Sequence, residues 1–188
     1  MKIQLYFVVV FAFFTSLQAS FRLYFDTQVL ISFYYESLCR DCHVFIENQL
    51  KPIVLNLGSL VIVDLIVYGN AMMNQSNNEI ICQHGPPECT GNLYQACFIE
   101  NNNILQSLDF IMCMSKQKNP KNTDSAAQIC ATEMKVNWHS LYTCAKGIKG
   151  KNIIARNRKD TESLNPPHKH VPWITVYFFI VFILLKHY

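Results

Sequence analysis

The hydrophobic positions in the first third of the chain change from one period to another. Residues 29–35 form an unbroken apolar, β-branched and aromatic run, which is typical of a buried strand. From residue 42 to residue 57 the apolar positions follow helical spacing, with Pro52 expected to kink the helix and Gly58 to end it. Residues 60–68 are a second apolar run. The pattern therefore predicts a strand, a helix and a second strand, that is, a βαβ unit.

Both ends of the chain are more hydrophobic than its middle. Lys2 is followed by an uncharged apolar run and then by small and polar residues, so residues 1–19 are predicted to be a signal peptide cleaved after Ala19. Residues 177–188 form a hydrophobic C-terminal tail without turn residues, about five residues short of a bilayer span. The tail could contact a membrane as an anchor, belong to a lipid-anchor signal, or mark a shortened or misassigned chain end. A shortened or misassigned chain end is the preferred interpretation, because the change to an uninterrupted apolar run falls inside an expected core strand.

Composition narrows the choice of partner and compartment. The net charge of +3 is small, and the basic residues 146–159 lack interleaved aromatics, so nucleic acid is not expected as a partner. All eight cysteines follow the predicted signal peptide, and an even number in the secretory pathway indicates disulfides. A metal site is not expected, because no second Cys-x2-Cys follows the first and His84 lies too close to Cys82 for zinc-finger spacing. Asn74 is the one N-glycosylation acceptor.

Cys39-Arg40-Asp41-Cys42 stands where the first strand meets the helix. A thiol at a helix start lies near unpaired N–H groups and the positive end of the helix dipole, which stabilise its thiolate. Cys39 is therefore the predicted nucleophile, and Cys42 the residue that resolves the mixed disulfide. A Cys-x2-Cys beside a βαβ unit indicates a thioredoxin-like redox protein, although an inert structural disulfide is the alternative.

A second motif spans residues 82–97, Cys-Gln-His-Gly-Pro-Pro-Glu-Cys-Thr-Gly-Asn-Leu-Tyr-Gln-Ala-Cys. It resembles the signature of the gamma-interferon-inducible lysosomal thiol reductase (GILT) family at every fixed position. Val171 and Pro172 resemble the segment in which that family carries a cis-proline beside its active site, and they are the candidate substrate-binding residues. His84 could tune a thiol, but it lies in a Gly-Pro-Pro turn flanked by cysteines, so a structural role is the preferred interpretation.

The resemblance implies an α/β fold in which residues 20–176 form a thioredoxin-like thiol reductase domain, with a disulfide-stapled helical insertion at about residues 75–145. Helix-compatible stretches at residues 92–98, 104–114, 125–134 and 138–144 fit this insertion. The C-terminal strand and helix of the family are expected to be missing or replaced. The structural disulfide candidates, whose pairing the sequence leaves open, are Cys82, Cys89, Cys97, Cys113, Cys130 and Cys144.

The resemblance also implies an activity: reduction of disulfides in protein substrates, in lysosomes or outside the cell, often at acidic pH. A dithiol of this kind needs no bound cofactor and is recycled by a small-molecule thiol reductant. Two alternatives stay open. One is a disulfide oxidase or isomerase on the same fold, and the other is a non-catalytic, cysteine-rich secreted binding protein.

Overall fold

The computed structural model describes residues 21–77 and 79–186, and a three-stranded sheet organises the chain. Its strands are β1 (Phe21–Tyr35), β2 (Val61–Val67) and β5 (Trp173–Lys186), in the order β2-β1-β5. β1 runs parallel to β2 and antiparallel to β5. The predicted βαβ unit is confirmed, because β1 and β2 are joined through the helix that begins after Cys39.

That connecting helix is interrupted where the sequence predicts it. α2 (Arg40–Phe45) passes into the π-helical turn η2 (Ile46–Leu50) and then into α3 (Lys51–Leu57). Pro52 lies in the first turn of α3, where its missing N–H costs least, and the wider η2 turn absorbs the local mismatch. Gly58, with φ of +52°, ends α3 and opens the short 3-10 helix η3 (Gly58–Leu60).

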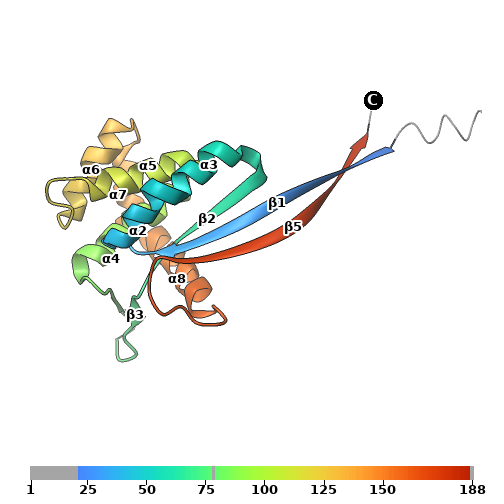
Figure 1. Cartoon of the computed structure of the whole chain (residues 1–188). Helices are drawn as coiled ribbons and strands as arrows, with labels where there is room; N and C mark the ends of the chain where they lie inside the picture. The colour runs from blue at the N-terminus through green and yellow to red at the C-terminus, as the bar shows by residue number, and fades with distance from the viewer. Residues whose placement is uncertain (1–20, 78, 187–188) are drawn as a thin grey trace, which may run out of the picture.

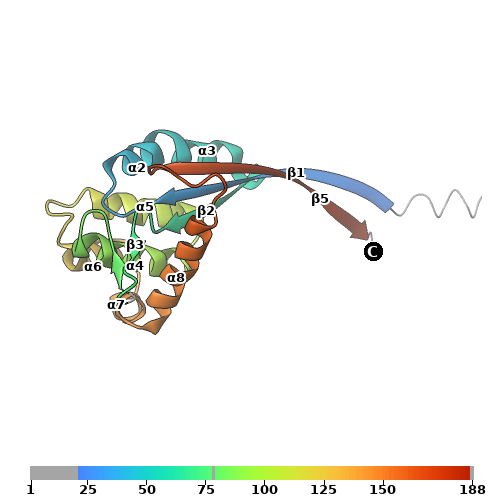
Figure 2. The same cartoon turned by 90° about the horizontal axis from the view of Figure 1, so that it is seen from below.

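Helices cover both faces of the sheet (Figure 2). α2 and α3 lie on one face, where the Phe33 ring stacks on Phe45 with centroids 5.3 Å apart. α8 (Ile148–Glu162) lies on the other face, and the Asn157 side chain donates to the Val67 carbonyl at 3.2 Å. The sequence did not predict α8. Its lysines and asparagines suggested a solvated stretch, yet Ile153 and Ile154 supply a narrow buried stripe.

The remaining helices form a cluster at the end of the sheet that carries the Cys-x2-Cys motif (Figure 1). All four predicted helical stretches are confirmed; the first begins at Pro86, six residues earlier than expected. A two-stranded hairpin precedes the cluster. The elements are β3 (Met72–Met73), β4 (Ile80–Ile81), α4 (Pro86–Ile99), α5 (Ile104–Ser115), α6 (Thr123–Glu133) and α7 (Trp138–Lys146).

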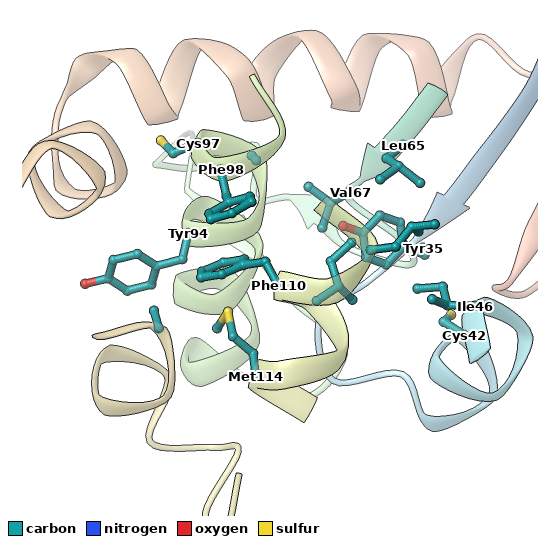
Figure 3. Close-up of a cluster of buried hydrophobic side chains, with 14 of the residues drawn as sticks. Tyr35, Cys42, Ile46, Leu65, Val67, Tyr94, Cys97, Phe98, Phe110 and Met114 are labelled. Carbon is teal, nitrogen blue, oxygen red and sulfur yellow. The ribbon is translucent and has the colours of Figure 1, made fainter. Parts of the chain in front are cut away.

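One hydrophobic core joins the sheet to the cluster (Figure 3). The Phe98 ring of α4 stacks on Phe110 of α5 with centroids 4.0 Å apart, and Tyr35 of β1 faces the same interior. Cys42 lies in this core beside Ile46 and is fully buried. Each large apolar side chain buried here contributes about 1.5–3 kcal/mol, so the core holds the active-site helix firmly against the sheet.

Three disulfides staple the helical part, and they select one of the pairings that the sequence left open. Cys97 of α4 bonds to Cys144 of α7, and Cys113 of α5 bonds to Cys130 of α6. The third bond closes the segment between β4 and α4. It joins Cys82 to Cys89. The insertion is thereby cross-linked across all four of its helices.

The C-terminal run is a strand. Residues 177–186, which the sequence sets apart as a hydrophobic tail, continue β5 and pair with β1 as far as Phe21. Runs of Val, Ile, Phe and Tyr favour a strand because they pack well on a pleated surface. Within residues 21–77 and 79–186, no helix is both long and apolar enough to cross a membrane. The predicted signal peptide at residues 1–19 lies outside the described residues.

Candidate active site

Cys39 and Cys42 are joined as a disulfide at the start of α2. Cys39 is the N-cap residue, and its Sγ accepts the backbone N–H of Cys42 at 3.1 Å. Cys39 is 7% exposed and Cys42 is fully buried. The two residues therefore differ in access, and Cys39 is the more exposed of the pair. Hydrogen bonding from N–H stabilises a thiolate at Sγ of Cys39 when the pair is reduced.

The loop before Cys39 is fixed by three hydrogen bonds to Ser37. Its N–H donates to Asn92 Oδ1 at 2.8 Å, and its hydroxyl donates to the Glu88 carbonyl at 3.0 Å. His43 Nε2 lies 3.1 Å from the Ser37 carbonyl, and burial lowers the pKa of His43. The neutral imidazole is therefore favoured, and it donates to that carbonyl. α4 approaches so closely that a Cβ at Gly91 would lie 2.5 Å from Ser37 Oγ.

The proline segment lies against the same disulfide. The Val171–Pro172 peptide bond is cis, as the sequence resemblance implies. The Val171 carbonyl oxygen lies 3.9 Å from Cys39 Sγ, and the Val171 side chain is buried. Residues far apart in sequence thus bring a backbone carbonyl next to the accessible sulfur.

A cleft of about 300 Å³ opens beside Cys39. Its floor includes Glu36 and Val171, and its rim includes the exposed Arg40 and Asp41. The other lining residues are Asn70, Gln83, His84 and His170. The cleft is polar and open to solvent, and it is large enough for a short segment of a substrate around a disulfide.

One side of the cleft contains a hydrogen-bonded cluster of Glu36, His84 and Glu88. His84 Nδ1 lies 2.6 Å from Glu88 Oε2 and 3.5 Å from Glu36 Oε1. Both carboxylates are buried, and Glu36 Oε2 accepts the Asn70 backbone N–H at 2.9 Å. Burial, followed by the charge of Glu88, raises the pKa of Glu36 despite that hydrogen bond. A Cβ at Gly69, whose φ is +65°, would overlap Glu36, so glycine is needed beside this carboxylate.

The same three side chains are close enough to be considered as metal ligands, since their donor atoms lie within 4.8 Å of one another. Two ligands bound tetrahedrally to one zinc ion, each about 2.0–2.1 Å from the metal, lie about 3.3 Å apart. The 2.6 Å separation of His84 Nδ1 and Glu88 Oε2 is instead a hydrogen-bond distance. We therefore interpret the cluster as a hydrogen-bonded one.

The structure brings the predicted site residues together selectively. Cys39, Cys42 and Val171 meet at one point, with Pro172 adjoining. The Cys82–Cys89 disulfide closes the turn that carries His84 into the cleft. The sequence favoured a structural role in the turn for His84 over a thiol-tuning role, and the structure places His84 in the cleft beside Cys39.

Asn74 lies apart from this site, on the β3–β4 hairpin. Its Oδ1 accepts the N–H of Ser76 at 2.9 Å. Sequence reasoning did not single out Glu36, His43 or Asn92 as site residues. Glu88 and Asn92 are the fixed Glu and Asn of the residue 82–97 motif, which is a sequence signal for both. Polar residues fixed in a motif are expected to have hydrogen-bond partners when they are buried. Nothing local in the sequence singles out Glu36.

The fold is similar to that of DsbA proteins of known structure. The DsbA of Chlamydia trachomatis matches 83% of this chain and 84% of its own, with a TM-score of 0.58 and 13% sequence identity. The alpha-DsbA1 of Wolbachia pipientis matches 84% of this chain and 75% of its own, with a TM-score of 0.54 and 11% identity. At such identities the likeness concerns the fold alone, and it confirms the predicted thioredoxin-like sheet with a helical insertion.

Sequence comparison extends the likeness to a family. The chain is 36% identical over 152 residues to the gamma-interferon-inducible lysosomal thiol reductase of Carassius auratus, covering 79% of this chain and 59% of that protein. It is 34% identical over 166 residues to GILT-like protein 1 of Drosophila melanogaster, covering 80% of this chain and 66% of that protein. The chain therefore spans about three fifths to two thirds of the length of these curated relatives.

A family model matches residues 30–134, a range that holds the Cys39–Cys42 pair, the fixed positions of the residue 82–97 motif and the Cys113–Cys130 disulfide. This range is more than half of the chain. On these grounds the chain belongs to the gamma interferon inducible lysosomal thiol reductase (GILT) family.

Proposed function

We propose that this protein is a thiol reductase that reduces disulfide bonds in protein substrates through the Cys39–Cys42 dithiol. The observation that carries the proposal is the geometry of the pair. Cys39 is accessible from the cleft and accepts an N–H bond at its sulfur, whereas Cys42 is fully buried directly behind it. An accessible, stabilised thiolate backed by a shielded thiol is the arrangement that two-step disulfide exchange requires.

In the first step the Cys39 thiolate attacks one sulfur of the substrate disulfide, and the other substrate sulfur leaves and takes up a proton. In the second step the Cys42 thiol loses its proton to solvent and attacks Cys39 Sγ. The second substrate sulfur leaves and takes a proton, so the dithiol has become a disulfide and the substrate two thiols. The Val171 carbonyl, 3.9 Å from Cys39 Sγ, is positioned to accept a substrate backbone N–H beside Pro172.

A small-molecule thiol would return the disulfide to the dithiol, and no bound cofactor is required. The proposed compartment is supported by the sequence pattern at the N-terminus and by the relatives named as lysosomal. Residues 1–19 would direct the chain into the secretory pathway, residues 20–176 would form the reductase domain, and the mature protein would act in lysosomes or outside the cell. Asn74 lies on the hairpin and is not among the residues that line the cleft, so a glycan there is compatible with an open active site.

The test is reduction of a disulfide-containing protein by the folded chain, with Cys39→Ser and Cys42→Ser variants beside it. The proposal predicts turnover by the wild type and loss of at least about 100-fold in both variants, because each step needs its own sulfur. Measurement of the reduction potential against glutathione separates a reductase from an oxidase, since a reductase has the more negative potential. A folded wild-type protein without turnover would refute the proposal.

A further inference from the structure

His84 differs from ordinary surface histidines because two buried carboxylates hold one edge of its ring. Its Nδ1 lies 2.6 Å from Glu88 Oε2 and 3.5 Å from Glu36 Oε1, while its backbone N–H donates to Glu88 Oε1 at 3.0 Å. The side chain is nevertheless 41% exposed and lines the cleft beside Cys39. We propose that His84 is the proton donor to the first substrate sulfur that leaves when Cys39 attacks a disulfide. This inference rests on the reductase function proposed above.

The hydrogen bond from Nδ1 to Glu88 settles which ring nitrogen is free. With Nδ1–H bound to a fully buried carboxylate, the proton exchanged with the cleft is the one on Nε2. A carboxylate behind an imidazole fixes its orientation and stabilises the imidazolium, which is the role of the acidic residue in a Ser-His-Asp triad. The Cys82–Cys89 disulfide adds rigidity to the turn from which His84 projects.

Carboxylates lie on the buried side of the ring. Glu88 and Glu36 face it from α4 and from the end of β1, and the cleft also exposes Arg40, Asp41 and His170. Burial raises the pKa of Glu36, so this carboxyl takes up a proton in mildly acidic solution more readily than an exposed one. Glu88, whose Oε2 lies 2.6 Å from Nδ1, is the carboxylate in direct contact with the His84 ring.

The proton transfer completes the first exchange step without any further reactant. A bond forms between Cys39 Sγ and the nearer substrate sulfur as the substrate S–S bond breaks. The electron pair of the broken bond leaves on the farther sulfur, and that sulfur takes the proton from His84 Nε2. An alkyl thiolate, whose thiol has a pKa of about 8.5, is a poor leaving group at acidic pH unless it is protonated. His84 is afterwards reprotonated from solvent.

His170 also lines the cleft and is the natural comparison. Its ring packs edge-on against Trp173, with centroids 5.9 Å apart, and no carboxylate among the described residues forms an ion pair with it. Within residues 21–77 and 79–186 it therefore lacks the carboxylate pairing that orients His84. It is therefore a matched control of the same residue type at the same cleft.

The experiment compares two small substrates for wild-type, His84→Asn and His170→Gln proteins at about pH 5. One is an alkyl disulfide, whose departing thiolate needs a proton. The other is an electron-poor aryl disulfide, whose thiolate is stable without one. We expect His84→Asn to lower kcat/KM about 100-fold for the alkyl disulfide and less than about threefold for the aryl disulfide, as loss of a general acid predicts. His170→Gln should keep the wild-type ratio of the two rates.

The asparagine variant also controls for structure, because its amide can still donate to Glu88 in place of Nδ1. Equal losses for both disulfides would mean that His84 only supports the loop, and would overturn the proposal. Wild-type pH profiles give a second measurement that needs no variant: the ratio of alkyl to aryl rates should fall with rising pH, because a general acid must carry a proton to act. A constant ratio would contradict the role of His84. A folded wild type that reduces neither disulfide would refute the reductase function itself.

Discussion

The contact between Gly91 of α4 and Ser37 gives a quantitative prediction for a Gly91→Ala substitution. The added Cβ would lie 2.5 Å from Ser37 Oγ and 3.0 Å from Ser37 Cβ, and 3.3 Å from Thr123 Cγ2. Overpacking of this kind costs about 1–3 kcal/mol. Displacing Ser37 also weakens its hydrogen bond to the Glu88 carbonyl, worth about 0.5–1.5 kcal/mol.

Alanine has the better helix propensity, and this offsets about 1 kcal/mol of the loss. The net prediction is a destabilisation of about 2 kcal/mol by Gly91→Ala, measured as the change in the free energy of unfolding of the oxidised protein in urea. A Ser37→Gly background removes both nearest atoms. In that background the same substitution at Gly91 should be neutral or stabilising, which gives a coupling energy of about 1–3 kcal/mol.

The double-mutant cycle isolates the contact between Gly91 and Ser37, because the hydrogen bonds that Ser37→Gly removes by itself cancel from the coupling energy. A Gly91→Ala change that costs the same in both backgrounds would refute the close approach of α4 to this loop. A stabilising effect of Gly91→Ala in the otherwise wild-type protein would do so as well, since helix propensity alone would then account for the result.

Two further predictions concern stability. Because the pKa of Glu36 is raised in the folded protein, this residue stabilises the fold below the ordinary glutamate pKa of about 4.5, and that stabilisation is lost as pH rises through the raised value. The Glu36→Gln variant should therefore show a smaller decline in the free energy of unfolding in urea between acidic and neutral pH. An unchanged decline would contradict the burial of this carboxyl group. Replacing Cys97 and Cys144 by alanine opens a loop with a sequence separation of 47 and should cost about 4 kcal/mol of stability, whereas replacing Cys82 and Cys89, whose separation is 7, should cost about 2 kcal/mol. Thermal unfolding of the two double variants tests this order. A reversed order would contradict the loop-entropy account.

The parts of this fold that could be predicted from sequence are those governed by local periodicity. The β1–α2 junction, the break near Pro52 and the end of the helix at Gly58 all follow from patterns within a few residues. The sequence did not predict α8, because a few buried apolar residues such as Ile153 and Ile154 can anchor a helix whose surface is mostly charged and polar.

The candidate site likewise contains features that local sequence patterns predict and features that depend on tertiary packing. The Cys-x2-Cys motif can be identified from sequence alone, because its chemistry needs two thiols at fixed spacing at the start of a helix. The Ser37–Asn92 hydrogen bond joins residues 55 apart in sequence, and the Glu36–His84 contact is likewise tertiary. Such pairs are set by how α4 packs against the end of β1, which no local pattern encodes. For the same reason, the disulfide pairing needed three-dimensional distances.

The most direct test of the reductase mechanism is to trap its covalent intermediate. The Cys42→Ser protein, reduced and mixed with a disulfide-containing protein, should accumulate a mixed disulfide at Cys39, because the buried resolving thiol that would release the substrate is gone. Mass spectrometry of the conjugate identifies the linked residue, and a Cys39→Ser/Cys42→Ser protein serves as the control. A stable conjugate through Cys39, absent from the control, is the predicted result. No conjugate from a folded, reduced Cys42→Ser protein, or one formed through another cysteine, would contradict the mechanism.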